Sequence, residues 1–179
     1  MAKPKLKEPS KGQLLEREIN RINEEYASEG MATFKKTPNN WVIQRKGPHI
    51  VGAKPVPSGI CDYFGTSHYI GGRTVVFDAK ESSLKKQFNL KNIKPEQMDH
   101  MREVTANGGL AFCLVWFTAL DEYYCLTSDF IGPYWDASES EEAVQHIPIQ
   151  DIRESCHKLE DGAYYLQYVI KLHNESAPE

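Results

Sequence analysis

Apolar residues recur at helical spacing near the start of the chain and in short extended runs after it. Residues 11–29 repeat them on one helix face, and Gly30 follows as a stop signal, so we predict a helix there. That face consists of Leu15, Ile19, Ile22 and Tyr26. Residues 31–36 and 41–45 are predicted strands on either side of the turn signal TPNN.

The apolar run AFCLVWFT at residues 111–118 is continuous rather than alternating. A run of this kind indicates a central strand that is buried on both faces. We predict residues 121–127 as its hairpin partner. A helix is predicted at 94–107, because a proline stands near its start and a Gly-Gly pair follows its end.

Two further strands are predicted at residues 60–64, continuing towards Ile70, and at 73–80, joined through a Gly-Gly pair. The last third of the chain predicts a short helix near 149–158. It ends with an apolar stretch at 164–172 whose pattern fits either a helix or a strand.

Residues 45–59, RKGPHIVGAKPVPSG, are rich in Pro and Gly and show no regular periodicity. We therefore expect an irregular segment that protrudes from the body of the protein. It carries four groups that can be cationic, namely Arg45, Lys46, His49 and Lys54.

The order of predicted elements indicates an α/β protein with a mixed central sheet flanked by helices. Residues 1–10 are rich in Lys and Pro and predict a disordered basic tail. Residues 11–174 are expected to form a single domain, followed by a flexible C-terminus at 175–179. We find no internal repeat.

The charge balance changes sign along the chain of 179 residues. The formal net charge is −4, yet residues 136–179 hold ten acidic and three basic side chains, and residues 1–135 hold the other fifteen acidic and eighteen basic ones. The positive balance of the longer part permits nucleic-acid binding without indicating it.

The four cysteines are scattered, with no CxxC pair, which argues against a zinc site and favours free thiols. No apolar run approaches the length that crosses a bilayer, and the charged N-terminus lacks the apolar stretch of a secretory signal. We expect a cytoplasmic protein without a membrane partner or an organic cofactor.

Candidate chemistry gathers where the strand at 73–80 ends. Asp78 and Lys80 lie two positions apart, so they point to one side of a strand while Ala79 points into the core. Asp62 precedes Asp78 by sixteen positions, and a hairpin can bring the two together. Two carboxylates with a backbone carbonyl, here that of Ala79, form a hard oxygen site suited to Mg²⁺ or Mn²⁺. A neighbouring lysine can orient the attacking water and stabilise charge on a phosphate.

A pattern of two acids and a lysine also occurs by chance, and it then marks an ordinary Asp–Lys pair at a solvated strand end. Glu16 is a candidate metal ligand if its helix packs against the strand end, and otherwise a boundary residue; Glu18 lies on another helix face. Gln97 shares a face of the 94–107 helix with His100 or Met101. The simpler interpretation puts Met101 in the core and makes His100 a satisfied polar group.

Cationic side chains bracket this constellation in the sequence, as binding to a phosphate backbone requires. The segment at 45–59 precedes Asp62, and four lysines follow the strand. These are Lys85, Lys86, Lys91 and Lys94. Such runs are also typical of solvated faces, so they support nucleic-acid binding only as corroboration.

The ordered motifs resemble those of the RecU family of Holliday-junction resolvases, within the PD-(D/E)xK nuclease superfamily. The matching motifs are Gly12-x-x-x-Glu16, Lys35-Lys36-x-Pro38, Asp62-Tyr63, Phe77-Asp78-Ala79-Lys80-Glu81 and Phe88-x-Leu90-x-Asn92-Ile93 with Gln97-x-x-His100-Met101. The resemblance covers roughly residues 11–135 and implies a restriction-endonuclease-like fold.

The resemblance implies Asp62 and Asp78 as metal ligands, Lys80 as the catalytic lysine, Glu16 as a helix-borne acidic partner and Gln97 close to the site. It also implies a homodimer that places two active sites on a four-way junction and nicks opposing strands symmetrically. Residues 45–59 would be a stalk that enters the junction centre. The predicted DNA contacts are Lys36, Arg45, Lys46, His49, Lys54, Lys85 and Lys86.

Two departures from the family pattern bear on activity. Asp78 stands where the family commonly has Glu, and Ile60 and Cys61 stand where it usually has hydroxyl side chains. Three alternatives therefore stay open: a nuclease of this fold that cuts another DNA structure or a specific duplex sequence, a DNA-junction binder with weak or no catalysis, and an α/β protein unrelated to DNA.

Overall fold

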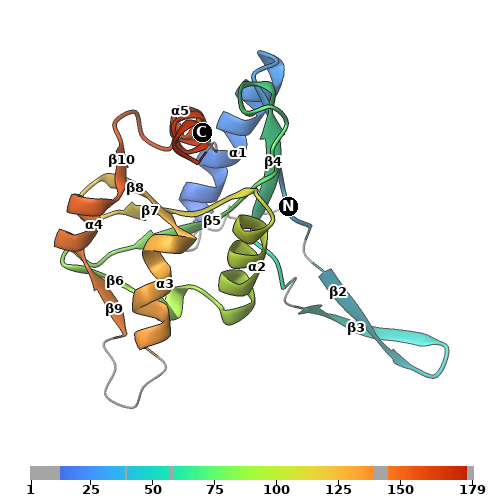
Figure 1. Ribbon diagram of the computed structural model, residues 1–179. Coiled ribbons are helices and arrows are strands. Elements are labelled where there is room, and N and C mark those ends of the chain that lie inside the picture. The colour runs from blue at the N-terminus through green and yellow to red at the C-terminus, as the bar shows by residue number, and fades with distance from the viewer. Residues whose placement is uncertain (1–12, 39, 57–58, 139–144, 177–179) are drawn as a thin grey trace, which may run out of the picture.

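The computed structural model describes residues 13–38, 40–56, 59–138 and 145–176, and a mixed sheet runs through its centre (Figure 1). Within these residues the sheet has six strands in the order β1-β4-β5-β7-β8-β10. Their bounds are Ala32–Lys36 (β1), Tyr63–Ser67 (β4), Val75–Ser82 (β5), Leu110–Phe117 (β7), Glu122–Thr127 (β8) and His157–Leu159 (β10). Strands β5 and β7 pair in parallel and the other neighbours pair antiparallel. The predicted mixed central sheet is confirmed.

Helices cover both faces of the sheet. Their bounds are Gln13–Ser28 (α1), Pro95–Ala106 (α2), Ser128–Ala137 (α3), Ile149–Ser155 (α4) and Leu166–Glu175 (α5), with short 3-10 turns at His68–Ile70 and Leu90–Asn92. Helices α1 and α5 share one core cluster with the sheet, and α2, α3 and α4 share the other. No helix in the described part of the chain is long and apolar enough to cross a membrane.

Strand β5 shows how the alternation of side chains sets up the site. Val75 and Phe77 belong to the core under α1, whereas Val76 belongs to the core under α2. Continuing this alternation puts Asp78 on the α2 side and Ala79 on the α1 side, where it packs against the core. The neighbouring β7 is buried along nearly its whole length, as its continuous apolar run predicted.

The protruding segment is a β-hairpin rather than an irregular loop. Strands β2 (Asn40–Lys46) and β3 (His49–Val56) pair with each other and extend away from the body (Figure 1). The predicted protrusion is confirmed, but the predicted lack of regular structure is wrong. Every residue of β2 and nearly every residue of β3 is exposed, so no buried face imposes a period-two pattern on the sequence. Gly47, with a φ of 61°, provides the turn.

Several other elements differ from the prediction. Helix α3 and the small sheet of β6 (Gln87–Asn89) with β9 (His146–Pro148) were not anticipated. The helix predicted at 149–158 ends at Ser155, since residues 157–159 join the main sheet as β10. The ambiguous stretch at 164–172 is helical in α5 from Leu166 onwards.

The strand predicted at 60–64 begins only at Tyr63. The predicted tail at 1–10 lies outside the described residues. So does most of the predicted flexible end, while Glu175 closes α5.

Candidate active site

Pairing of β4 with β5 brings the predicted acids and lysine together. Tyr63 pairs with Phe77, so Asp62 lies directly before β4 beside Asp78 on β5. The Lys80 Nζ lies 3.9 Å from Asp62 Oδ2 and 3.8 Å from Asp78 Oδ1. One ammonium is thus shared by two carboxylates at the strand end.

Gln97, from the first turn of α2, connects the members of this cluster. Its Nε2 donates to Asp78 Oδ1 at 2.9 Å, and its Oε1 accepts from Lys80 Nζ at 3.0 Å. The same Oε1 accepts from the Lys94 backbone N–H at 3.1 Å, which fixes the side chain at the start of the helix. Gln97 therefore orients both the lysine and the buried carboxylate.

Asp78 is fully buried, and its two carboxylate oxygens differ in their partners. Oδ1 accepts from Gln97 and from the Asp62 backbone N–H, whereas Oδ2 has no hydrogen-bond partner among the described residues. Burial raises the pKa of this carboxyl to about 7; the Lys80 ammonium opposes that shift and the Asp62 carboxylate adds to it. A buried oxygen without a partner is costly unless a cation or donor completes it.

The donor set fits a hard divalent cation. Asp78 Oδ2 is free to ligate, and the side chain of Asp62 is 31% exposed, so a hydrated ion can reach it. The Ala79 carbonyl belongs to the same strand end. The described residues contain no group of three or more His, Cys, Asp or Glu side chains suited to a metal. Backbone carbonyls and water would complete the shell, as is usual for Mg²⁺.

Glu16 has a different neighbour in the structure. Its Oε2 forms an ion pair with Lys36 Nζ at 2.5 Å, and its backbone carbonyl accepts from the Tyr63 hydroxyl at 3.3 Å. Glu18 lies elsewhere and accepts from the Tyr123 hydroxyl. Glu16 is therefore beside β1 and the start of β4, with its charge already opposed, and its role as a metal ligand stays a prediction.

Cys61, which stands where the family pattern usually has a hydroxyl side chain, turns its side chain away from solvent. The thiol is buried in the core under α2; its Sγ lies 3.9 Å from the Gln97 carbonyl oxygen and 3.3 Å from His100 Nδ1. Burial raises the pKa of this thiol, so it stays protonated. All four cysteines are free. In this structure Cys61 is a packing group between the site and α2.

The predicted DNA-binding cations fall into two exposed groups and one ion pair. Arg45, Lys46, His49 and Lys54 lie on the β2–β3 hairpin, and Lys85 and Lys86 lie between β5 and β6. Lys36 is half-buried against Glu16. Sequence reasoning missed Thr37, which follows β1 and hydrogen-bonds to the Cys61-Asp62 segment.

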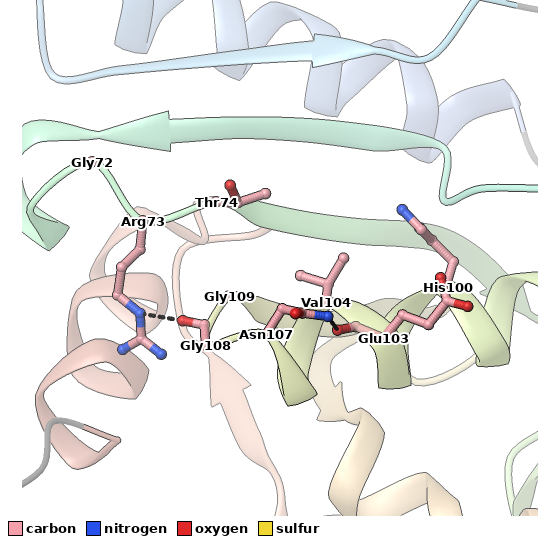
Figure 2. Close-up of a pocket in the computed structure, with 9 residues that line it drawn as sticks. All are labelled: Gly72, Arg73, Thr74, His100, Glu103, Val104, Asn107, Gly108 and Gly109. Atoms are coloured by element: carbon pink, nitrogen blue, oxygen red, sulfur yellow. Dashed lines mark hydrogen bonds between the residues drawn. The ribbon is translucent and has the colours of Figure 1, made fainter.

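A cavity of about 500 Å³ lies near the C-terminal end of α2, and Figure 2 shows the residues that line it. The Arg73 Nε donates to the Gly108 carbonyl at 2.7 Å across one end, and His100 lies at the other. None of the predicted catalytic residues lines it. His100 connects this cavity to the site, because its ring also accepts a hydrogen bond from the Cys61 N–H.

Comparison with known proteins shows which family the chain resembles. The sequence profile of a family described as "RecU: Recombination protein U" matches residues 10–174. The chain is similar to the Holliday junction resolvase RecU of Lactococcus lactis subsp. lactis, with 36% identity over 90% of this chain and 78% of that protein. It is also similar to the Holliday junction resolvase RecU of Geobacillus kaustophilus, with 31% identity over 86% and 78%. Among solved structures, Hjc from Archaeoglobus fulgidus, a Holliday junction resolvase, is 10% identical. That comparison covers 80% of this chain and 93% of Hjc, with a TM-score of 0.46.

Proposed function

The chain belongs to the Recombination protein U (RecU) family, and from this premise we propose that it is a metal-dependent endonuclease that resolves four-way DNA junctions. Relatives that match most of the chain carry the name Holliday junction resolvase. The single observation that supports the chemistry best is the buried Asp78 Oδ2, which lies beside Asp62 and Lys80 and has no hydrogen-bond partner in the part of the chain that the structure describes. The expected compartment is the cytoplasm, where chromosomal DNA would be the substrate.

In this proposal Asp62 and Asp78 hold Mg²⁺, with Mn²⁺ as a substitute and the Ala79 carbonyl as a further ligand. The bound ion would lower the pKa of a water and neutralise charge on the phosphate. Lys80 would place its ammonium near the scissile phosphate and stabilise the negative charge that grows there. The hydrogen bond from Lys80 to Gln97 fixes the direction of that ammonium before substrate arrives.

The β2–β3 hairpin would supply much of the DNA contact. Its cationic side chains are exposed and lie on a ribbon that projects from the body, where phosphates can approach (Figure 1). The same ribbon exposes large apolar side chains, namely Trp41, Val42, Ile43, Ile50, Val51 and Val56. Exposed apolar surface of this kind supports a homodimer in which a second copy of the chain covers these side chains. Such a dimer would hold two active sites for symmetric nicks.

The test is cleavage of a labelled four-way junction, beside linear duplex and single-stranded controls, with Mg²⁺ or with EDTA. The proposal expects paired symmetric nicks on the junction alone, lost with EDTA, with Asp62→Asn and with Lys80→Ala. Tight junction binding without cleavage in either Mg²⁺ or Mn²⁺ would favour a catalytically silent binder. Equal cutting of linear duplex would favour a nuclease of this family with another substrate.

A further inference from the structure

The dipeptide Cys61-Asp62 lies just outside the strand ladder, yet each of its four backbone polar groups has a defined partner. The Cys61 N–H donates to His100 Nδ1 at 3.1 Å, and the Cys61 carbonyl accepts from the Thr37 hydroxyl at 2.7 Å. The Asp62 N–H donates to Asp78 Oδ1 at 2.9 Å. The Asp62 carbonyl accepts from the Thr37 N–H at 2.8 Å.

These partners come from three separate elements of the fold. Thr37 follows β1, Asp78 lies on β5, and His100 lies on α2. A segment without ladder pairing has freedom in its backbone dihedrals, and each bond from a different element removes part of it. The backbone of Asp62 is thereby fixed while its carboxylate stays partly open to solvent.

We propose that Thr37 and His100 are positioning residues, which hold the backbone before β4 so that the Asp62 carboxylate meets the metal at the correct place. This inference rests on the proposed function, because it gives Asp62 the role of a ligand. Neither residue touches the reacting atoms; each acts through the main chain of Cys61 and Asp62.

Thr37 contributes through two groups with different chemistry. Its backbone N–H continues the β1–β4 pairing and survives any substitution except proline. Its hydroxyl supplies the bond to the Cys61 carbonyl and can be removed alone. Thr37→Val keeps the shape and loses that bond, whereas Thr37→Ser keeps the hydroxyl.

His100 acts as an acceptor. A backbone N–H always donates, so Nδ1 must carry its lone pair towards Cys61, and the ring proton sits on Nε2. In His100→Asn the side-chain Oδ1 stands about where Nδ1 was and can accept the same bond. His100→Leu, of similar size to Asn, leaves the Cys61 N–H without its acceptor.

The experiment measures Mn²⁺ binding to the full chain by titration calorimetry, with Asp62→Asn as reference and Thr33→Val, an exposed position on β1, as matched control. Loss of a group that orients a ligand typically costs about 10–100-fold in metal affinity. We expect Thr37→Val and His100→Leu to weaken Mn²⁺ binding by at least about tenfold. Thr37→Ser, His100→Asn and Thr33→Val should stay near wild type. Junction binding in EDTA should be unchanged in all of them.

The outcomes distinguish a failure of the positioning role from a failure of the proposed metal site. If Asp62→Asn loses Mn²⁺ affinity while Thr37→Val and His100→Leu keep it, the positioning role is wrong and the metal site stands. If the wild type binds no Mn²⁺, or Asp62→Asn binds it as well as the wild type, the metal site and the positioning role both fall. Thermal unfolding of each variant shows whether it folds. If Thr37→Val does not, the His100→Leu and His100→Asn pair decides.

Discussion

The strand-end site and the β2–β3 hairpin both carry charged side chains, but they hold them in opposite ways. At the strand end Asp78 is fully buried, accepts a hydrogen bond from Gln97 at 2.9 Å and has the Lys80 ammonium 3.8 Å away. On the hairpin every residue of β2 is exposed, and cations such as Arg45 and Lys54 project into solvent. Catalysis needs side chains that the core holds in fixed positions. Contact with a branched, flexible nucleic acid needs cationic side chains that can move to meet the phosphates.

The largest expected effect separates the two regions directly. Lys80→Ala should lower the single-turnover cleavage rate of a junction by about 10²–10³-fold, because it removes a preorganised charge from the reacting phosphate. Junction affinity in the absence of metal should stay near wild type, since the hairpin is intact. A gel-shift titration and a quench-flow time course measure the two quantities. A parallel loss of both would mean that the regions are not separable.

The second prediction removes cations from the hairpin and leaves the strand-end site intact. The triple substitution of Arg45, Lys46 and Lys54 by Ala should weaken junction binding and reduce the slope of log K against log salt by up to about three, because each of these cations would neutralise one phosphate in the wild type. The cleavage rate at saturating protein should change little. Lys171→Ala, an exposed lysine on α5, is the control. An unchanged salt slope in the triple variant would remove the hairpin from the DNA interface.

A smaller effect concerns the stability of the metal-free protein. The Asp78 carboxyl has a pKa of about 7 when folded against about 4 in the unfolded chain, so the folded state holds the extra proton between those values. Stability should therefore fall as pH rises from about 4 to 7. Asp78→Asn, which lacks that charge, should exceed wild-type stability by up to about 4 kcal/mol at pH 8, the equivalent of about three pKa units, and by progressively less towards pH 5.

Urea unfolding at both pH values, with EDTA present, measures this difference. Adding Mg²⁺ at pH 8 should stabilise the wild type and leave Asp78→Asn unaffected, because the variant lacks a ligand. Higher wild-type stability than Asp78→Asn at pH 8 in EDTA would contradict the assignment of Asp78 as a buried charge whose burial Lys80 only partly offsets.

The smallest effect is expected at Cys61. Because its thiol packs against α2 and not towards solvent, Cys61→Ser should leave Mn²⁺ affinity and cleavage within a few-fold of wild type. Burying a hydroxyl there should cost about 1–2 kcal/mol of stability. Cys61→Ala is the matched variant without a polar group. Loss of cleavage in the alanine variant at unchanged stability would give the thiol a chemical role.

The site was predictable where its parts follow from local patterns. Asp78 and Lys80 could be placed on one side of a strand by counting positions, and Gln97 lies at the start of a helix with a clear proline signal. The role of Thr37 could not be found this way. It depends on the register that pairs Lys36 with Tyr63, and sequence periodicity does not give the register between strands.

The elements of the fold were likewise predictable only where a local sequence pattern marks them. Helix α1 and strand β7 have continuous buried surfaces, so their apolar patterns are strong. Of the two hairpin strands, β2 contains the strand predicted at 41–45, whereas β3 has no buried face and its Pro- and Gly-rich sequence shows no pattern to detect. Helix α3 was missed because it contains Pro133, which ordinarily argues against a helix, and its packing on the sheet overrides that preference.

The central claim is that Asp62 and Asp78 hold the divalent ion at the end of β5, and a crystal soaked in Mn²⁺ tests it most directly. Anomalous diffraction at the manganese edge locates the ion without reference to activity. We predict one peak in contact with the carboxylates of both residues, with Asp78 Oδ2 as a ligand and Lys80 close by. A peak that lies elsewhere, or no peak at the strand end at millimolar Mn²⁺, would contradict the account.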